Sequence, residues 1–332
     1  MRSFTCALGL SAVAILGASW AIAETPVLTV LTYDSFASEW GPGPAVEKAF
    51  EQTCGCDLKF VVAGDGAALL ARVQLEGAKS DASVVLGLDT NLTAAAAATG
   101  LFAPHGQTRA NDLPVAFADP LFLPFDWGWF AFVYDNGKLV NPPTSFEELA
   151  ASDLKIVIED PRSSTPGLGL LMWVKAAYGD RAPEIWAALA DNIVTVTPGW
   201  SEAYGLFLNG EADMVLSYTT SPAYHLIAEN DASKSAAAFT EGHYMQVEVA
   251  GKLAAAPQPE LADQFLAFMA TDAFQSIIPT TNWMYPAYTP EAGLPDGFKA
   301  MISPEKSLLL SAPDALTARK PALDEWLTAL SR

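Results

Sequence analysis

Short apolar runs alternate with stretches of helical periodicity along most of the chain. Residues 27–32 (VLTVLT), 59–63 (KFVVA) and 83–87 (SVVLG) have the length and composition of buried strands. Helical stretches at 45–53 and 67–77 separate them. Strands that alternate with helices predict an α/β fold with a mainly parallel sheet.

The same alternation resumes after Pro124. The aromatic, β-prone segment 127–134 suggests a strand that crosses between two lobes. Overlapping helix-capping patterns occupy 144–149. Further strands are expected at 155–158, 194–197, 214–217 and 246–250, and loops at 33–44 and at the other strand ends. One long amphipathic helix is expected at 259–278.

The first residues predict export. Arg2 precedes an apolar run at 6–20, and Ala21 and Ala23 supply small side chains at the −3 and −1 positions of a cleavage site. The run is short for a membrane span, which needs roughly 20 residues. We expect residues 1–23 to be a signal peptide cleaved after Ala23, and the protein to reside in the periplasm.

The remaining length of about 310 residues exceeds a typical single core, so two lobes are expected. Their predicted limits are 24–123 for the first part of lobe 1, 124–240 for lobe 2, and 241–332 for the second part of lobe 1 with C-terminal helices. Binding loops of open α/β sheets gather at the carboxyl ends of the strands. A ligand cleft is therefore expected between the lobes, which crossing strands would join.

The charge balance is strongly acidic, with 18 Lys and Arg against 38 Asp and Glu and a net charge of −20. Such a surface repels nucleic acid, so no nucleic-acid partner is expected. It would attract a cationic solute weakly, although acidity serves solubility equally well.

Two cysteines, Cys54 and Cys56, remain after the signal peptide, and only Gly55 separates them. Thiols in an oxidising compartment tend to pair, and the flexible glycine makes so small a ring feasible. A metal or catalytic thiol site is the alternative. Zinc is disfavoured because no histidine or second cysteine pair lies nearby.

Several predicted strand-end loops combine an aromatic residue, a glycine or proline, and small hydroxylated residues. Their recurrence after successive strands predicts an aromatic-walled cleft with many hydroxyl groups. They span 33–44, 64–66, 163–167, 199–202, 218–224 and 280–286.

Two of these loops have two interpretations each. Asp65 could accept hydrogen bonds from a ligand or cap the helix that follows it. The hydroxyls and proline of 163–167 could open an anion-binding helix start or an ordinary capped helix. Arg162 could assist a phosphate or pair within its lobe. The aspartates at other strand ends typically cap turns, and no ligand role is assigned to Asp34, Asp89, Asp126 and Asp160.

Long motifs closely resemble the thiamine-binding periplasmic proteins. They are 26–44 (PVLTVLTYDSFASEWGPGP), 160–171 (DPRSSTPGLGLL), 194–224 (VTVTPGWSEAYGLFLNGEADMVLSYTTSPAY) and 282–286 (NWMYP). The resemblance covers nearly all of the chain after residue 23 and includes the Cys-x-Cys pair. More distantly, the pattern is similar to the bilobal iron- and polyamine-binding proteins of ABC importers.

The resemblance implies a type II periplasmic-binding-protein fold that captures thiamine, thiamine monophosphate or thiamine diphosphate and delivers it to a membrane permease. It implies a monomer without catalytic residues, resident metal or cofactor. The expected ligand contacts, from the family and from the aromatic loops, are Tyr33, Trp40, Asp65, Gly66, Ser164, Thr165, Trp200, Tyr218, Thr219, Thr220, Ser221, Pro222, Tyr224 and Trp283.

Three other functions stay open at this point. A thiaminase I-like enzyme shares the bilobal fold but needs a free cysteine nucleophile and a carboxylate base in the cleft. A polyamine carrier would also use acidic and aromatic residues. A ferric-ion carrier is less favoured, because no pair of adjacent tyrosines is evident.

Overall fold

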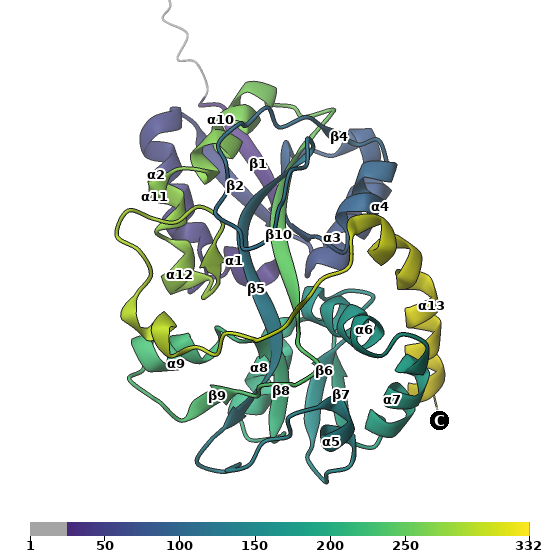
Figure 1. Cartoon of the computed structure of the whole chain (residues 1–332). Helices are drawn as coiled ribbons and strands as arrows, with labels where there is room; N and C mark the ends of the chain where they lie inside the picture. The colour runs from purple at the N-terminus through teal and green to yellow at the C-terminus, as the bar shows by residue number, and fades with distance from the viewer. Residues whose placement is uncertain (1–24, 332) are drawn as a thin grey trace, which may run out of the picture.

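A continuous path of hydrogen-bonded strands forms the frame of the molecule (Figure 1). The structure is a computed structural model and describes residues 25–331. In spatial order the strands are β2 (Asp57–Val62), β1 (Val27–Thr32), β3 (Val84–Asp89), β10 (His243–Leu253), β5 (Phe122–Asp135), β8 (Met214–Tyr218), β6 (Ile156–Glu159) and β7 (Ile193–Thr197).

The predicted signal peptide at 1–23 lies outside the described residues. Within 25–331, no helix is long and apolar enough to cross a membrane.

The first strand group contains β1, β2 and β3, which are mutually parallel as the alternating pattern predicts. Helices α2 (Gly43–Cys54), α3 (Gly66–Glu76) and α10 (Pro259–Met269) pack around it. Leu28 and Val30 of β1 and Phe265 of α10 are fully buried in its core. Burial of such side chains supplies about 1.5–3 kcal/mol each, which fixes the group as one unit.

The second strand group contains β6 with its parallel neighbours β7 and β8. Helices α6 (Thr165–Tyr178) and α8 (Trp200–Leu208) pack on it, and α7 (Ala182–Leu189) packs against α6. Trp173 and Trp186 are fully buried in the core beneath α6 and α7. The structure thus has two α/β halves, the upper and the lower half of the molecule in Figure 1.

Two long antiparallel strands join the halves. The first part of β5 pairs with β10, whereas residues 130–134 of β5 pair with β8 of the second group. The other edge of β10 pairs with β3 of the first group. The crossing strand predicted at 127–134 is therefore part of β5, which runs from the upper to the lower half in Figure 1, while β10 runs in the opposite direction.

The predicted long helix at 259–278 is wrong in its second half. Helix α10 ends at Met269, and the separate short helices α11 (Asp272–Gln275) and α12 (Ile278–Thr281) follow. Thr271 has an extended backbone and begins α11, while Pro279 starts the first turn of α12. The apolar positions continue across both breaks because all three segments face the same core.

Short elements complete the connections. The loop predicted at 33–44 contains the one-turn helix α1 (Asp34–Ala37). The capping pattern at 144–149 is confirmed, because the Ser145 hydroxyl accepts the Glu148 N–H at the start of α5 (Phe146–Ala150). The remaining elements are α4 (Thr93–Ala98), β4 (Phe102–Ala103), α9 (Pro222–Ala228), β9 (Lys234–Ala236), β11 (Tyr285–Pro286), β12 (Ser307–Leu308), α13 (Ala312–Leu330) and 3₁₀ turns at Gly77–Lys79, Gly179–Arg181 and Asp296–Ala300.

The C-terminal helix α13 packs against α6 and α7 and also reaches α4 (Figure 1). It therefore contacts both halves, although the predicted division of the chain assigns it to lobe 1. The limits proposed for the two lobes stay predictions.

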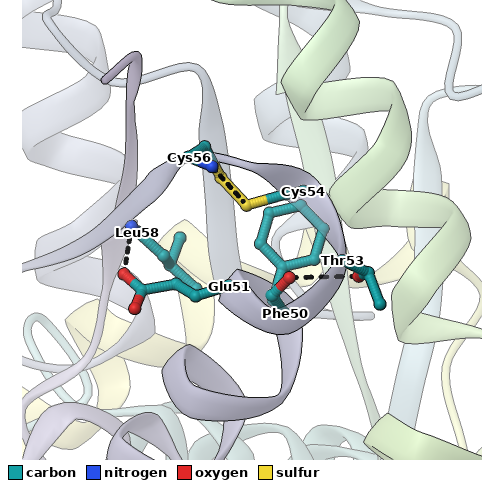
Figure 2. The surroundings of a disulfide bond; sticks show 6 residues. All are labelled: Phe50, Glu51, Thr53, Cys54, Cys56 and Leu58. Atoms are coloured by element: carbon teal, nitrogen blue, oxygen red, sulfur yellow. Dashed lines mark hydrogen bonds between the residues drawn. A yellow bond between two sulfur atoms is a disulfide. The ribbon is translucent and has the colours of Figure 1, made fainter. Parts of the chain in front are cut away.

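Cys54 and Cys56 form a disulfide at the end of α2, as predicted (Figure 2). Gly55 between them adopts φ +62°, a left-handed conformation that glycine accepts readily. Next to it, the Glu51 carboxylate accepts the Leu58 N–H at 2.9 Å and ties α2 to β2. The disulfide and this hydrogen bond together close the turn between α2 and β2.

Candidate ligand-binding site

A cavity of about 490 Å³ is lined by residues of both halves. Its size is typical of a small-molecule site. Many of the predicted ligand contacts meet in its wall, although they come from six separate stretches of the chain. These residues are Tyr33, Trp40, Asp65, Thr165, Trp200, Tyr218, Ser221, Tyr224 and Trp283.

Other predicted contacts lie behind the wall. The Gly66 N–H donates to the Thr165 hydroxyl at 3.0 Å, and the Ser164 hydroxyl accepts the Gly167 N–H at 3.4 Å. Thr219 and Thr220 are fully buried at the turn before α9. Ligand contact by these residues and by Pro222 stays a prediction.

The sequence interpretation missed one face of α8. Ser201, Tyr204, Gly205 and Leu208 line the cavity in addition to Trp200. Their spacing is that of one helical face, so a helix beginning at Trp200 could have revealed them. Other lining residues without an assigned role are Ser35, Pro166, Gln246, Glu248, Thr280, Thr281, Asn282 and Met284.

Aromatic rings form the wall on the α8 side. The Trp200 ring stacks on Tyr204 with centroids 5.0 Å apart, and Trp40 approaches Trp200 at 6.2 Å. The Trp200 Nε1–H donates to the Ser217 hydroxyl at 2.7 Å, which fixes the ring. Trp40 is 55% exposed, so it forms the rim of the cavity.

Trp283 adopts φ +58°, in the left-handed region that bulky side chains rarely occupy. Its ring meets Tyr224 edge-on at 5.4 Å in the cavity wall. Backbone strain of this kind costs on the order of 1–3 kcal/mol and tends to persist at functional sites. The strained position favours a functional role for Trp283 over simple packing.

A hydrogen-bonded histidine lies behind the aromatic wall. His225 is buried, and its Nε2 is 3.0 Å from the Tyr204 hydroxyl. Its Nδ1 is 2.7 Å from Glu229 Oε2. The histidine therefore holds Tyr204 in place and does not line the cavity.

The charged side chains of the wall are carboxyls. Asp65 and Glu248 line the cavity, and its lining contains no lysine, arginine or histidine among residues 25–331. Burial raises the pKa of Asp65 to about 6, although hydrogen bonds from Ser164 and the Trp200 N–H oppose the shift. Burial also raises the pKa of Glu248 well above its usual range. The site is suited to a cationic ligand.

Three hydrogen bonds cross the cleft. They join the start of α3, in the upper half of the molecule, to residues of the lower half. Asp65 Oδ2 accepts the Trp200 N–H at 3.2 Å, and the Gly66 N–H reaches Thr165. The Ala68 N–H donates to the Ser163 carbonyl at 3.1 Å. Asp65 precedes α3 but makes no side-chain cap, so its carboxylate serves the cleft. The structure shows the two halves in contact.

The start of α6 shows the ordinary capped arrangement, because the Ser164 hydroxyl accepts the Gly167 N–H. Thr165 nevertheless lines the cavity at the first helical position. Arg162 pairs with Asp160 within its lobe and is not part of the cavity wall.

Two α/β halves, two crossing strands and a cavity between the halves define a type II two-lobed solute-binding protein. Comparison with known proteins agrees with this class. The family model described as "Bacterial extracellular solute-binding protein" matches residues 41–276.

The relatives are more specific. The thiamine-binding periplasmic protein of Salmonella typhimurium is 55% identical over 310 residues, 92% of this chain and 94% of the relative. That of Brucella melitensis is 50% identical over 328 residues, 98% of each chain. A solved structure titled "Periplasmic thiamin binding protein" matches with a TM-score of 0.91 and 54% identity, covering 93% of this chain and 97% of the other. The chain belongs to the family of thiamine-binding periplasmic proteins, within the bacterial extracellular solute-binding proteins.

Proposed function

We propose that this protein binds thiamine in the cavity between its halves and delivers it to the membrane permease of an ABC importer. The observation that carries the proposal is the cavity wall itself. It combines aromatic rings with two carboxyl groups and has no basic side chain among the described residues. The protein would capture thiamine in the periplasm, the compartment named for its relatives.

Thiamine consists of a flat aminopyrimidine and a cationic thiazolium joined by a methylene group. Stacking on Trp200 or Trp283 suits both rings, and cation–π attraction adds about 0.5–2 kcal/mol for the thiazolium. Glu248 and Asp65 offset the positive charge. Hydroxyls of Ser201, Ser221 and Thr165 complete the polar edge of the cavity.

Thiamine monophosphate and diphosphate are proposed as further ligands. The support is the first turn of α6, where Thr165 and Pro166 line the cavity at the positive end of a 14-residue helix. Since Arg162 is occupied by Asp160, a phosphate would depend on backbone N–H groups and hydroxyls. We therefore expect a phosphate to add less affinity than it does where an arginine binds it.

A thiaminase-like activity lacks its nucleophile here. Both cysteines of the described chain are joined to each other at the end of α2, and neither lines the cavity. The relatives are named as binding proteins, in keeping with a transport component and not an enzyme.

We further propose that a single copy captures the ligand by closure. Crossing strands β5 and β10 would act as the hinge, and the bonds from Asp65, Gly66 and Ala68 would hold the closed form. The closed form would then dock on the permease.

Equilibrium dialysis tests the proposal directly. The protein without residues 1–23, stripped of ligand by unfolding and refolding, would be dialysed against thiamine, thiamine monophosphate, thiamine diphosphate, spermidine or ferric citrate. Saturable retention of intact thiamine at submicromolar concentration is expected, with little retention of spermidine or iron. Retention of spermidine or iron in preference to thiamine would refute the proposal, and recovery of cleaved thiamine would establish an enzyme.

A further inference from the structure

Two carboxyl groups lie next to each other at the cavity, one in its wall and one behind it. Glu248 of β10 and Asp126 of β5 occupy opposite positions in the antiparallel pairing of these strands. Glu248 is 5% exposed and lines the cavity, while Asp126 is fully buried. Side chains at directly opposed strand positions are neighbours, so the two acids form one buried pair.

The pair has neutral hydrogen-bonding partners. The Tyr33 hydroxyl donates to Glu248 Oε2 at 2.9 Å, and the Asn282 Nδ2–H donates to Asp126 Oδ2 at 2.6 Å. Asn282 also donates to the Tyr33 oxygen at 2.9 Å. Among the described residues, no salt bridge reaches either acid.

Two buried acceptors in this region have no hydrogen-bond partner within the described chain. They are Asp126 Oδ1 and Gln246 Oε1. Gln246 is fully buried, lines the cavity, and lies two residues before Glu248 on the same face of β10. Its Nε2–H donates to the Tyr218 hydroxyl at 3.1 Å, which orients the amide. A buried acceptor without a partner is unfavourable, so Gln246 Oε1, which lines the cavity, points to a ligand that donates a hydrogen bond. Asp126 Oδ1 lies behind the cavity wall, where Asp126 adjoins Glu248.

The groups that surround the pair add negative charge or none. Tyr33, just before α1, and Asn282, just after α12, contact the pair. Tyr218 faces it from β8, and Asp89 of β3 contributes a further negative charge. Arg319 acts on Asp89 from α13 and does not neutralise the pair. Two adjacent carboxylates in such a setting cannot both ionise without a cation.

We propose that Glu248, with Asp126 behind it, is the subsite for the cationic ring of the ligand, that the side-chain oxygen of Gln246 beside it accepts an N–H from the ligand's amino group, and that the acid pair releases a proton when the ligand binds. In the ligand-free protein one carboxyl O–H bond of the pair is intact. The incoming organic cation takes over the neutralising charge, the O–H bond breaks, and the proton passes to the solvent. The inference rests on the proposed function, because thiamine is the cation used to test it.

The titration behaviour of the two acids agrees with a retained proton. Burial raises the pKa of Asp126, and burial followed by the charge of Asp126 raises the pKa of Glu248. Both shifts favour the protonated acid in the empty site, and a bound cation would reverse them.

Calorimetric titration with thiamine at pH 7 in PIPES, HEPES and Tris measures the proton. These buffers differ in ionisation enthalpy, so the slope of the observed binding enthalpy gives the number of protons exchanged. We expect release on the order of one proton per thiamine bound. Binding with no dependence on the buffer would overturn this inference and leave the proposed function intact. Absence of binding would overturn both.

Three variants assign the proton. Glu248→Gln keeps an acceptor for the Tyr33 hydroxyl, and it should abolish proton release and weaken thiamine binding by at least tenfold. Asp126→Asn should abolish proton release with a smaller loss of affinity, because Asp126 does not line the cavity. The control is Glu211→Gln, which changes an exposed carboxylate and should match the wild type.

Full proton release by both Glu248→Gln and Asp126→Asn would overturn the assignment to this pair. If Glu248→Gln does not fold, as thermal unfolding would show, the comparison of the wild type with Asp126→Asn decides it.

Discussion

Trp200 connects several parts of the site through one side chain. Its ring stacks on Tyr204, its Nε1–H is fixed by Ser217, and its backbone N–H donates to Asp65 across the cleft. The sequence pointed to Trp200 because it lies in a strand-end loop and in a motif shared with the family. The reason that it matters physically is its position at the junction of the two halves.

Replacing Trp200 separates ring stacking from the rest of the fold. We expect Trp200→Ala to weaken thiamine binding by at least tenfold, since the change removes a stacking surface worth about 1–3 kcal/mol with the cation–π contribution. Trp200→Phe is the matched control and should retain most of the affinity. Calorimetric titration measures both, and an unchanged affinity of Trp200→Ala would remove this ring from the site.

Asp65 makes a pH-dependent contribution to stability. Burial raises its pKa to about 6, so the folded protein binds this proton more tightly than the unfolded chain does. The stabilisation of the folded state by protonated Asp65 is present in full below about pH 4 and is lost as the pH rises through about 6. The ionised Asp65 therefore costs stability at neutral pH.

Asp65→Asn should accordingly stabilise the protein more at high pH. The gain in the free energy of unfolding is expected to be on the order of 1–2 kcal/mol larger at pH 8 than at pH 5. Urea unfolding of the variant and the wild type at both pH values measures the difference. A gain that does not vary with pH would mean that Asp65 titrates normally.

At the scale of elements, strands were easier to predict than helix ends. The strands at 27–32 and 214–217 needed only an apolar run of the right length, and β1 and β8 match them closely. The predicted helix at 259–278 failed because its apolar period continues through Thr271, where the backbone turns extended. Local periodicity reports the buried face and does not report a break in the axis.

The disulfide at the end of α2 is an element-scale feature with a small expected effect. A bridge that spans three residues restricts the unfolded chain only slightly, by about 1.5 kcal/mol in the loop-entropy estimate. The double change of Cys54 and Cys56 to Ser should lower the free energy of unfolding by this amount. Urea unfolding gives the loss, and calorimetry should give an unaltered thiamine affinity because neither cysteine lines the cavity.

A large loss of affinity in that double variant would contradict the separation of the disulfide from the site. Reduction of the wild type with a thiol reagent provides the matched comparison without any change of sequence.

At the scale of the whole molecule, the site depends on contacts that local sequence does not reveal. Tyr33, Trp200 and Trp283 could be predicted because aromatic residues in strand-end loops stand out. Glu248 and Gln246 could not, because every residue from 243 to 251 of β10 is buried. The packing of distant segments around β10 leaves Gln246 and Glu248 in the cavity wall, and no local pattern in the strand reveals this.

Ligand-dependent stability follows from a site shared by both halves. Thiamine bound between them stabilises the folded state alone, by about 4 kcal/mol at a thousand times its Kd. We expect thermal unfolding to shift upward with thiamine concentration in one cooperative transition. Stabilisation confined to one of two separate transitions would mean that the ligand binds to a single half.

The most direct test of the central claim is the intrinsic tryptophan fluorescence of the ligand-stripped protein, titrated with thiamine. Trp40, Trp200 and Trp283 all line the cavity, so a ligand there must alter their emission. We expect saturable quenching at submicromolar thiamine, strongly reduced in Trp200→Ala, with the vitamin recovered intact. A flat response to thiamine, from protein shown to be folded and free of ligand, would contradict it.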